Sequence, residues 1–261
     1  MLLKGAKALI TGSRRGIGRE IAVKLAEEGA DIGLNDIEYD QAAIDTMKKI
    51  DDIGGNTSWH LADIADTGQV NKMFDDFLNL HGRIDILVNN AVARRVRSVL
   101  EISERDWDLE IGSGLKGYFM CSQRAAKEMI SQCTGGNIVS ISSIHAFAAF
   151  PDDLVYGVCK AGIIRMTKSL ALDLSGHNIR ANCIAPGYID SRLLDPKDEY
   201  LRGKGDNYQE VMHTIPSRRA GLPSDIAGTV VLLSSSYADY VNGECITVDG
   251  GYMAGLYTPE V

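Results

Sequence analysis

The chain has 261 residues, of which 45% are hydrophobic and 24% are charged, and its formal net charge is -8. This length and composition are typical of a soluble α/β protein with one large core. The acidic balance argues against a nucleic-acid-binding protein, because such proteins usually carry a basic excess.

The sequence contains neither a recognisable targeting segment nor a membrane span. Residues 1–6 lead directly into an apolar run and lack the long apolar stretch of a signal peptide. No apolar run approaches the roughly 18 residues that are needed to cross a bilayer. The five cysteines show no Cys-x-x-Cys spacing, which argues against a disulfide framework or a metal site. We therefore expect a cytoplasmic protein without a metal ion.

Short apolar runs alternate with amphipathic stretches along the whole chain. Apolar runs without polar alternation are typical of strands that are covered on both faces. Strands are expected at residues 7–11, 31–35, 58–62, 86–90, 137–142, 179–184 and 245–248. Helices are expected at residues 17–28, 41–53, 69–80, 114–132, 155–174 and 224–234. This order predicts a single α/β domain, with helices on both faces of a parallel sheet and right-handed crossovers.

Residues 191–219 depart from this pattern, because they are polar and contain Pro196, Gly203, Gly205 and Pro216. The segment follows a predicted strand at its C-terminal end, which is where ligands bind in open α/β sheets. Long irregular insertions in compact domains are often lids or binding loops. We expect this segment to cover the substrate; the alternative is a surface insertion without a role.

A glycine-rich turn at residues 11–18 lies between the first predicted strand and the first helix. Glycines permit a tight turn and close approach of the backbone to a pyrophosphate, and the helix N-terminus offers free N–H groups. The turn is not a Walker A loop, because no Gly-Lys-Ser/Thr follows. It could be a plain turn or a site for another nucleotide, but its position favours a dinucleotide. The candidate cofactor residues here are Gly12, Ser13, Arg15, Gly16, Ile17 and Gly18.

Asp36 ends the second predicted strand. An acidic residue about 20 positions after the glycines can accept hydrogen bonds from the ribose 2′-OH of the cofactor and would repel a 2′-phosphate. Arg15 could instead pair with that phosphate. Because Asp36 would lie directly at the hydroxyl, the sequence favours NAD over NADP.

Tyr156 and Lys160 are four residues apart in a predicted helix, and Ser143 lies thirteen residues before the tyrosine. A spacing of four places both side chains on one helical face. An ammonium beside a phenol favours the phenolate and lowers its pKa from about 10. A Tyr-x-x-x-Lys pair alone is common on surfaces. Together with Ser143 and a dinucleotide turn, it predicts the transfer of a proton beside a hydride acceptor.

With these motifs the chain resembles the compact branch of the short-chain dehydrogenases/reductases over essentially its whole length. The shared motifs are residues 11–18, Asp63, 89–91, Ser143, Tyr156, Lys160, 182–187 and 248–251. The resemblance implies a Rossmann-type, doubly wound, seven-stranded parallel sheet, often in homotetramers or homodimers.

The resemblance also implies roles for individual residues. Tyr156 matches the general acid/base, Lys160 the residue that holds the nicotinamide ribose, and Ser143, rather than Ser142, the residue that binds the substrate oxygen. The other implied cofactor contacts are Asp63 and Ile64 at the adenine, Asn90 at a strand end, and Pro186, Gly187, Ile189 and Ser191 near the nicotinamide.

Two positions depart from the family pattern. Gly114 stands where the family usually has an asparagine that helps to hold a water in a proton relay, partly through its backbone carbonyl. Glycine keeps that carbonyl, so the relay can survive. Val92 stands where the family has glycine, and a β-branched residue should narrow the backbone freedom there. Neither change removes the proton donor, so we expect an active enzyme.

The expected reaction interconverts a secondary alcohol and a ketone with NAD, with Tyr156 as the proton acceptor in the oxidative direction. His145 and Arg94 are candidate substrate residues, because either could bind a hydroxyl or an acidic group. Similar family members that act on sugars, polyols and sugar acids carry basic residues in this region, so the resemblance implies a sugar, polyol or hydroxy acid as substrate. A 3-oxoacyl thioester reductase is the alternative, against which Asp36 argues. A dinucleotide-sensing protein without catalysis is another alternative, against which the intact Ser/Tyr/Lys set argues. A nucleotide-sugar epimerase is a further alternative, but such enzymes normally have a longer chain and a different glycine spacing.

Overall fold

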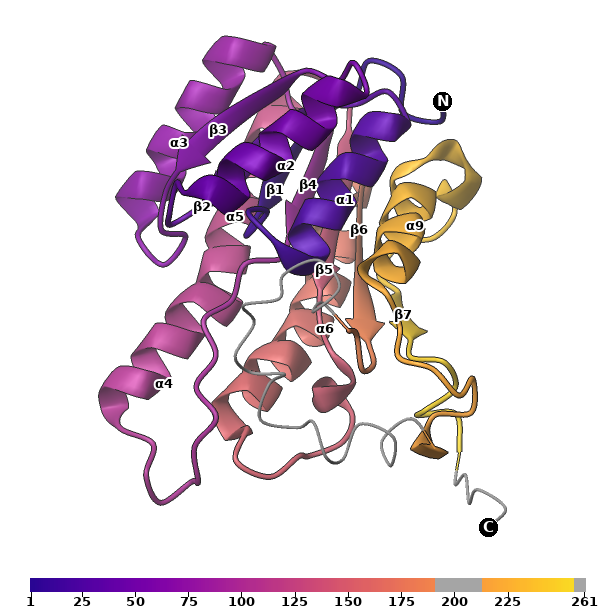
Figure 1. Cartoon of the computed structure of the whole chain (residues 1–261). Coiled ribbons are helices and arrows are strands. Elements are labelled where there is room, and N and C mark those ends of the chain that lie inside the picture. The colour runs from indigo at the N-terminus through magenta and orange to yellow at the C-terminus, as the bar shows by residue number, and fades with distance from the viewer. Residues whose placement is uncertain (191–212, 256–261) are drawn as a thin grey trace.

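A parallel sheet with helices on both faces forms the body of the protein in the computed structural model, which describes residues 1–190 and 213–255 (Figure 1). The strands are β1 Lys7–Thr11, β2 Asp31–Asp36, β3 Thr57–Leu61, β4 Ile86–Asn89, β5 Gly136–Ile141, β6 Ile179–Pro186 and β7 Cys245–Val248. Within the described residues they form one seven-stranded sheet in the order β3-β2-β1-β4-β5-β6-β7. The predicted α/β fold and its seven strands are confirmed, with small differences at the strand ends.

Two layers of helices cover the sheet. The main α-helices of the described chain are α1 Gly16–Glu27, α2 Gln41–Asp52, α3 Thr67–His81, α4 Glu104–Ile111, α5 Gly117–Ser131, α6 Leu154–Leu174 and α9 Pro223–Ser234. Helices α1, α2 and α9 cover one face of the sheet, and α3, α5 and α6 cover the other (Figure 1). Buried side chains of the first group belong to one core cluster and those of the second group to another. Along β1, Ala8 and Ile10 pack in the first cluster and Leu9 in the second, because successive side chains of a strand point to opposite faces.

Helix α4 is absent from the sequence prediction, which began a helix only at Gly114. The structure instead continues α4 through a π-helical turn, Gly112–Lys116, into α5. Ser103 caps α4: its Oγ accepts the backbone N–H of Asp106, while the Asp106 carboxylate accepts the N–H of Ser103. This reciprocal cap is a readable sequence signal for a helix start that the prediction overlooked.

The strand order places a topological switch between β1 and β4, where crossovers from β1 and β4 run to opposite sides. In open α/β sheets the ligand crevice lies outside the carboxyl ends of the strands at such a switch. The glycine turn follows β1, Asn90 follows β4, and Ser143 lies just beyond β5. Residues that are distant in the sequence therefore reach one edge of the sheet.

Within the described residues, no helix is both long and apolar enough to cross a membrane. The same residues contain no group of three or more His, Cys, Asp or Glu side chains that could hold a metal ion.

Candidate active site

The structure brings Ser143, Tyr156 and Lys160 to neighbouring elements. Ser143 begins a short 3-10 turn, Ile144–Ala146, that packs against α6, and Tyr156 and Lys160 lie in the first turns of α6. The Lys160 Nζ lies 5.3 Å from the centre of the Tyr156 ring. The amine and the phenol are therefore close enough for the charge of one to affect the ionisation of the other.

The two adjacent serines have different partners. The Ser142 Oγ donates to the backbone carbonyl of Lys160 at 2.8 Å, which joins β5 to α6. The Ser143 Oγ accepts the backbone N–H of His145 at 3.2 Å, which leaves its own O–H as a donor. This difference supports Ser143 rather than Ser142 as the serine that would meet a substrate oxygen.

Lys160 is deeply buried, with 1% of its surface exposed. Its Nζ donates to the Ile141 carbonyl at 2.7 Å and to the Tyr118 hydroxyl at 3.4 Å. Burial lowers the pKa of Lys160 to about 7. The effect of Lys160 on Tyr156 requires the ammonium form, so that effect depends on how strongly the site retains the lysine proton.

The glycine turn can receive a dinucleotide. Gly12 and Gly16 have φ of 64° and 60°, a region that glycine tolerates far better than other residues. A Cβ at Gly12 would lie 2.6 Å from the Cα of Ala91, and one at Gly18 would overlap the Gly12 carbonyl. No side chain caps the N-terminus of α1 in the described chain, so its first N–H groups can face an anion.

Other predicted cofactor residues of this region hold the turn in shape. The Asn90 Nδ2 donates to the carbonyls of Thr11 and Gly12, at 3.1 and 2.8 Å, and so fastens the turn to the end of β4. The buried Ser13 Oγ accepts the backbone N–H of Asn35 at 3.0 Å. Arg15 lies exposed at the N-cap of α1, and Ile17 packs against the first core cluster.

Asp36 lies at the end of β2, next to a basic residue that the sequence analysis did not single out. The Arg14 Nε is 3.6 Å from the Asp36 Oδ1, and the same guanidinium contacts Glu38 and Asp40. Burial raises the pKa of the Asp36 carboxyl above its usual value, although Arg14 opposes this shift. The region expected to face the ribose 2′ position therefore holds a partly buried carboxylate together with an arginine.

The predicted adenine contacts differ in what they can offer. The Asp63 Oδ1 accepts the backbone N–H of Ala65 at 2.9 Å, which stabilises the turn after β3. The Ile64 side chain is 3% exposed and belongs to the second core cluster, where it packs against Gly117. Only the backbone of Ile64 is therefore placed to meet an adenine.

The predicted nicotinamide segment lies at the end of β6. Pro186 is the last residue of the strand, and Gly187 follows where a Cβ would come within 2.6 Å of Asp249. Ile189 forms an isolated bridge with Gly221. Ser191 and most of the expected substrate-covering segment, residues 191–212, lie outside the described residues.

Val92 and Gly114, the two residues that depart from the family pattern, lie next to each other in the structure. A Cβ at Gly114 would lie 3.3 Å from the Val92 Cγ2 and 3.2 Å from the Cys159 Sγ. A side chain at position 114 would therefore press on the valine methyl, which would have to shift by a few tenths of an ångström. The larger residue at 92, which is 38% exposed, thus lies against the smaller one at 114.

His145 and Arg94 both approach Tyr156. The Arg94 Cζ lies 4.5 Å from the centre of the Tyr156 ring, and the His145 ring meets that ring edge-on at 5.4 Å. Both side chains contact Asp153, a buried carboxylate that the sequence analysis missed. Asp153 occupies the N-cap of α6, but its side chain makes no capping bond, so a capping pattern alone could not have revealed these contacts.

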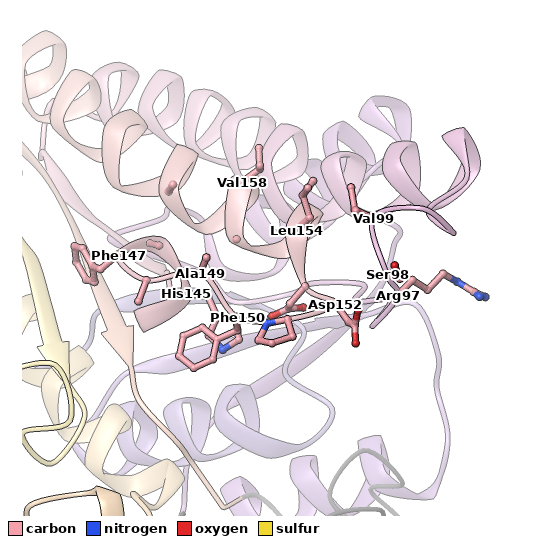
Figure 2. Close-up of a pocket in the computed structure, with 16 residues that line it drawn as sticks. Arg97, Ser98, Val99, His145, Phe147, Ala149, Phe150, Asp152, Leu154 and Val158 are labelled. Carbon is pink, nitrogen blue, oxygen red and sulfur yellow. Dashed lines mark ion pairs between the residues drawn. The ribbon is translucent and has the colours of Figure 1, made fainter. Parts of the chain in front are cut away.

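A largely apolar pocket of about 540 Å³ adjoins His145 (Figure 2). Its wall includes the His145 ring, which stacks on Phe150 with ring centres 3.9 Å apart, and also Leu154 and Val158 from α6. Neither Ser143, Tyr156 nor Lys160 lines it. His145 therefore stands between this pocket and the Tyr156 ring.

A family model described as Enoyl-(Acyl carrier protein) reductase matches residues 12–253. The chain is 37% identical over 253 residues to 2-dehydro-3-deoxy-D-gluconate 5-dehydrogenase of Escherichia coli (strain K12), covering 97% of each chain. It is 36% identical over 244 residues to the 3-oxoacyl-(acyl-carrier-protein) reductase FabG of Staphylococcus aureus (strain Mu50), covering 94% of this chain and 96% of that protein.

Solved structures agree with these matches. The gluconate 5-dehydrogenase of Burkholderia cenocepacia J2315, in complex with NADP and tartrate, superimposes with a TM-score of 0.89 at 33% identity, covering 97% of each chain. The protein therefore belongs to the short-chain dehydrogenase/reductase family, whose members are oxidoreductases that use a nicotinamide dinucleotide.

The contact between Val92 and Gly114 predicts how the two positions respond to substitution. Gly114→Asn alone should destabilise the protein by about 1 kcal/mol and lower turnover, because the new side chain must displace the Val92 methyl and the Cys159 side chain. The double variant Val92→Gly/Gly114→Asn should recover the part of the stability that the contact with Val92 costs, whereas the contact with Cys159 remains. Urea unfolding and turnover of both variants and of Val92→Gly test this; a Gly114→Asn protein as stable as the wild type would contradict it.

The buried lysine predicts a pH dependence of stability. The unfolded chain keeps the Lys160 proton up to its ordinary pKa of 10.5, whereas the folded, cofactor-free protein releases it near pH 7. The unfolded state thus binds more protons between these values, so the free energy of unfolding should rise with pH across this window. Lys160→Met should lack this contribution. Urea unfolding at several pH values measures both proteins, and parallel profiles would show the prediction to be wrong.

Proposed function

We propose that the protein interconverts a secondary alcohol and a ketone with NAD(H), and that Tyr156 is the proton-transferring residue. The observation that carries the proposal is the approach of the Lys160 Nζ to the Tyr156 ring, at 5.3 Å, beside Ser143. Membership of an oxidoreductase family supports the reaction class. Because of this membership, a dinucleotide-sensing protein without catalysis is the weaker alternative.

The residues around the glycine turn fit a dinucleotide. Gly12, Gly16 and Gly18 would let the pyrophosphate approach the backbone, and Asp36 would face the adenosine ribose. Lys160 would hold the nicotinamide ribose. When bound, the cofactor supplies the hydride acceptor or donor.

The protein's own residues would move the proton. In the oxidative direction, the Tyr156 phenolate accepts the proton of the substrate hydroxyl while the Ser143 O–H donates to the same oxygen as its carbonyl character develops. The ammonium form of Lys160 favours the phenolate. The backbone carbonyl of Gly114 lies in the π-helical turn, and we propose that it helps to hold the relay water that the family resemblance implies.

For the substrate we propose a sugar acid, or a related polyol or hydroxy acid. The curated relative from Escherichia coli and the solved structure from Burkholderia cenocepacia carry names of sugar-acid dehydrogenases, and the latter holds tartrate, a hydroxy acid. His145 can donate to a substrate hydroxyl or carboxylate. Arg94 is the less direct candidate for an anion, because Asp153 already binds its guanidinium.

A 3-oxoacyl thioester reductase is the second candidate function. The similarity to the Staphylococcus aureus FabG is close to that of the sugar-acid dehydrogenase and supports it. Asp36 argues against it, since such reductases usually take NADP and a carboxylate at the ribose would repel its 2′-phosphate. The gluconate 5-dehydrogenase structure that supports the sugar-acid proposal also holds NADP, so cofactor choice alone does not separate the two functions. The presence of Arg14 beside Asp36 weakens this argument without removing it.

We further propose a homotetramer or homodimer located in the cytoplasm. Large apolar side chains lie exposed on the helices that adjoin the site, where a second copy would cover them. These side chains are Trp107, Leu109, Phe119, Leu154 and Val158.

The reaction is tested with a panel of sugars, polyols, sugar acids and hydroxy acids, each assayed by the absorbance of the reduced nicotinamide. A 3-oxoacyl thioester, assayed in the reductive direction, tests the alternative. At least one sugar acid or polyol should be oxidised, and Tyr156→Phe should lower its turnover by about 10²–10⁴-fold, because the proton acceptor is lost. Full activity of Tyr156→Phe would defeat the assignment of this residue.

Cofactor preference should depend on Asp36. Removing its charge in Asp36→Asn should raise the NADP-to-NAD ratio of kcat/KM by about tenfold or more, equivalent to about 1.4 kcal/mol, because the repulsion of the 2′-phosphate is lost. Glu38→Gln is a matched control, since Glu38 contacts the same Arg14 but lies farther along the chain. An unchanged ratio in Asp36→Asn, or an equal rise in both variants, would rule out a specific role for Asp36.

A further inference from the structure

Asp153 is a buried charge for which the proposed chemistry has no use. Its side chain is 1% exposed, although it lies only three residues before Tyr156. Its two oxygens receive the Arg94 guanidinium in a forked arrangement, with Nε at 2.7 Å from Oδ1 and Nη2 at 2.5 Å from Oδ2. The His145 Nδ1 lies against the same Oδ2. A forked pair of this kind fixes the plane of the guanidinium.

Both side chains anchored on Asp153 touch the Tyr156 ring. Arg94 covers its face, with 4.5 Å from Cζ to the ring centre, and His145 meets its edge at an interplanar angle of 88°. The Phe150 ring in turn stacks on the His145 ring. One carboxylate therefore holds both of the side chains that flank the Tyr156 ring.

The charges in this cluster are largely paired. Burial opposes the ionisation of Asp153, but its contacts with His145 and Arg94 outweigh burial and lower the pKa of the carboxyl. Asp153 is thus an anion at neutral pH, and it offsets the charge of Arg94. A guanidinium committed in this way is poorly suited to receive a substrate carboxylate, but it can still act on the ring that it covers.

We infer that Asp153 is a positioning residue for the reaction, which holds Arg94 over the face of Tyr156 and His145 at its edge. The inference rests on the proposed role of Tyr156 as the proton acceptor. A cation held over the ring face favours the phenolate, and the flanking rings restrict where the phenol oxygen can point. Asp153 therefore acts through Arg94 and not through its own charge.

This arrangement gives a test by the sign of a pH shift. The groups that bear on Tyr156 are Arg94, His145 and Lys160, together with Asp153 and the buried Glu110 of α4, whose Oε1 accepts the backbone N–H of Arg95. The titratable Cys159 and Tyr118 also lie nearby. If Asp153 acted only as a nearby anion, removing its charge would favour the phenolate. If it holds Arg94 in place, removing it releases the cation from the ring and disfavours the phenolate.

The experiment measures kcat/KM against pH in the oxidative direction, with the best substrate of the panel. Asp153→Asn should move the rising limb of the profile to higher pH by about half a unit or more, because the cation leaves the ring. Arg94→Met should move it in the same direction. The double variant should show no larger shift than Arg94→Met alone, since the two residues act as one unit. Arg94→Lys, which keeps the charge without the fork, should give an intermediate shift.

Asp152→Asn is the matched control, because it removes the same charge from the exposed neighbour of Asp153, and its profile should match that of the wild type. Thermal unfolding and cofactor binding are measured for every variant. If Asp153→Asn does not fold, Arg94→Lys decides the matter, because it keeps the cation but loses the forked pair with Asp153; a rising limb at the wild-type pH in Arg94→Lys then overturns the inference. The inference is overturned if, in Asp153→Asn or in Arg94→Met, the rising limb of the pH profile stays at its wild-type position or moves to lower pH. Tyr156→Phe is measured alongside, and full activity there defeats the proposed function instead.

Discussion

The hydrogen bond from the Lys160 amine to the Ile141 carbonyl is the contact on which the geometry of the site depends. It joins α6 to the end of β5, deep enough that the amine is almost wholly removed from water. Ser142 reinforces the same junction from the strand side. Since Tyr156 lies one helical turn before Lys160 and Ser143 directly after Ser142, this junction determines where the phenol and the serine hydroxyl lie. The burial that positions the amine is also what weakens its hold on a proton.

Much of the fold could be predicted from the sequence, for physical reasons that are visible in particular elements. The strands of a parallel sheet are buried on both faces, so segments such as Ile86–Asn89 are continuous apolar runs. Helices such as Gly16–Glu27 show an apolar face at helical spacing. The glycine turn was predictable because its conformation permits few other residues. The Ser/Tyr/Lys set was found through its spacing and through the family resemblance, and the structure brings its members together.

The remaining features depend on contacts between segments that are distant in the sequence. Nothing in the local sequence links Arg94 to Asp153, because the pair forms only when the segment after β4 meets the start of α6. Arg14 and Arg15 are equivalent in a sequence pattern, and the direction of the backbone in the turn decides which one meets Asp36. Helix α4 was missed for a different reason, because the Ser103/Asp106 cap that marks its start can be read from the local sequence. Ile64 shows the converse: a residue matched to a ligand position by family pattern has its side chain in the core.

The shared space between Val92 and Gly114 also bears on the ancestry of this chain. Compared with the family pattern, the larger side chain lies at position 92 and the smaller at position 114, so we expect substitutions at the two positions to depend on each other. A lineage that changed position 114 first would have passed through a loosened intermediate, and one that changed position 92 first through a crowded intermediate. We expect the order in which position 114 changes first to be tolerated more often, because a small void is accommodated by a wider range of neighbouring side chains than a steric overlap. Close homologues that diverged during this exchange should therefore carry glycine at both positions, and those with bulky residues at both should be rare.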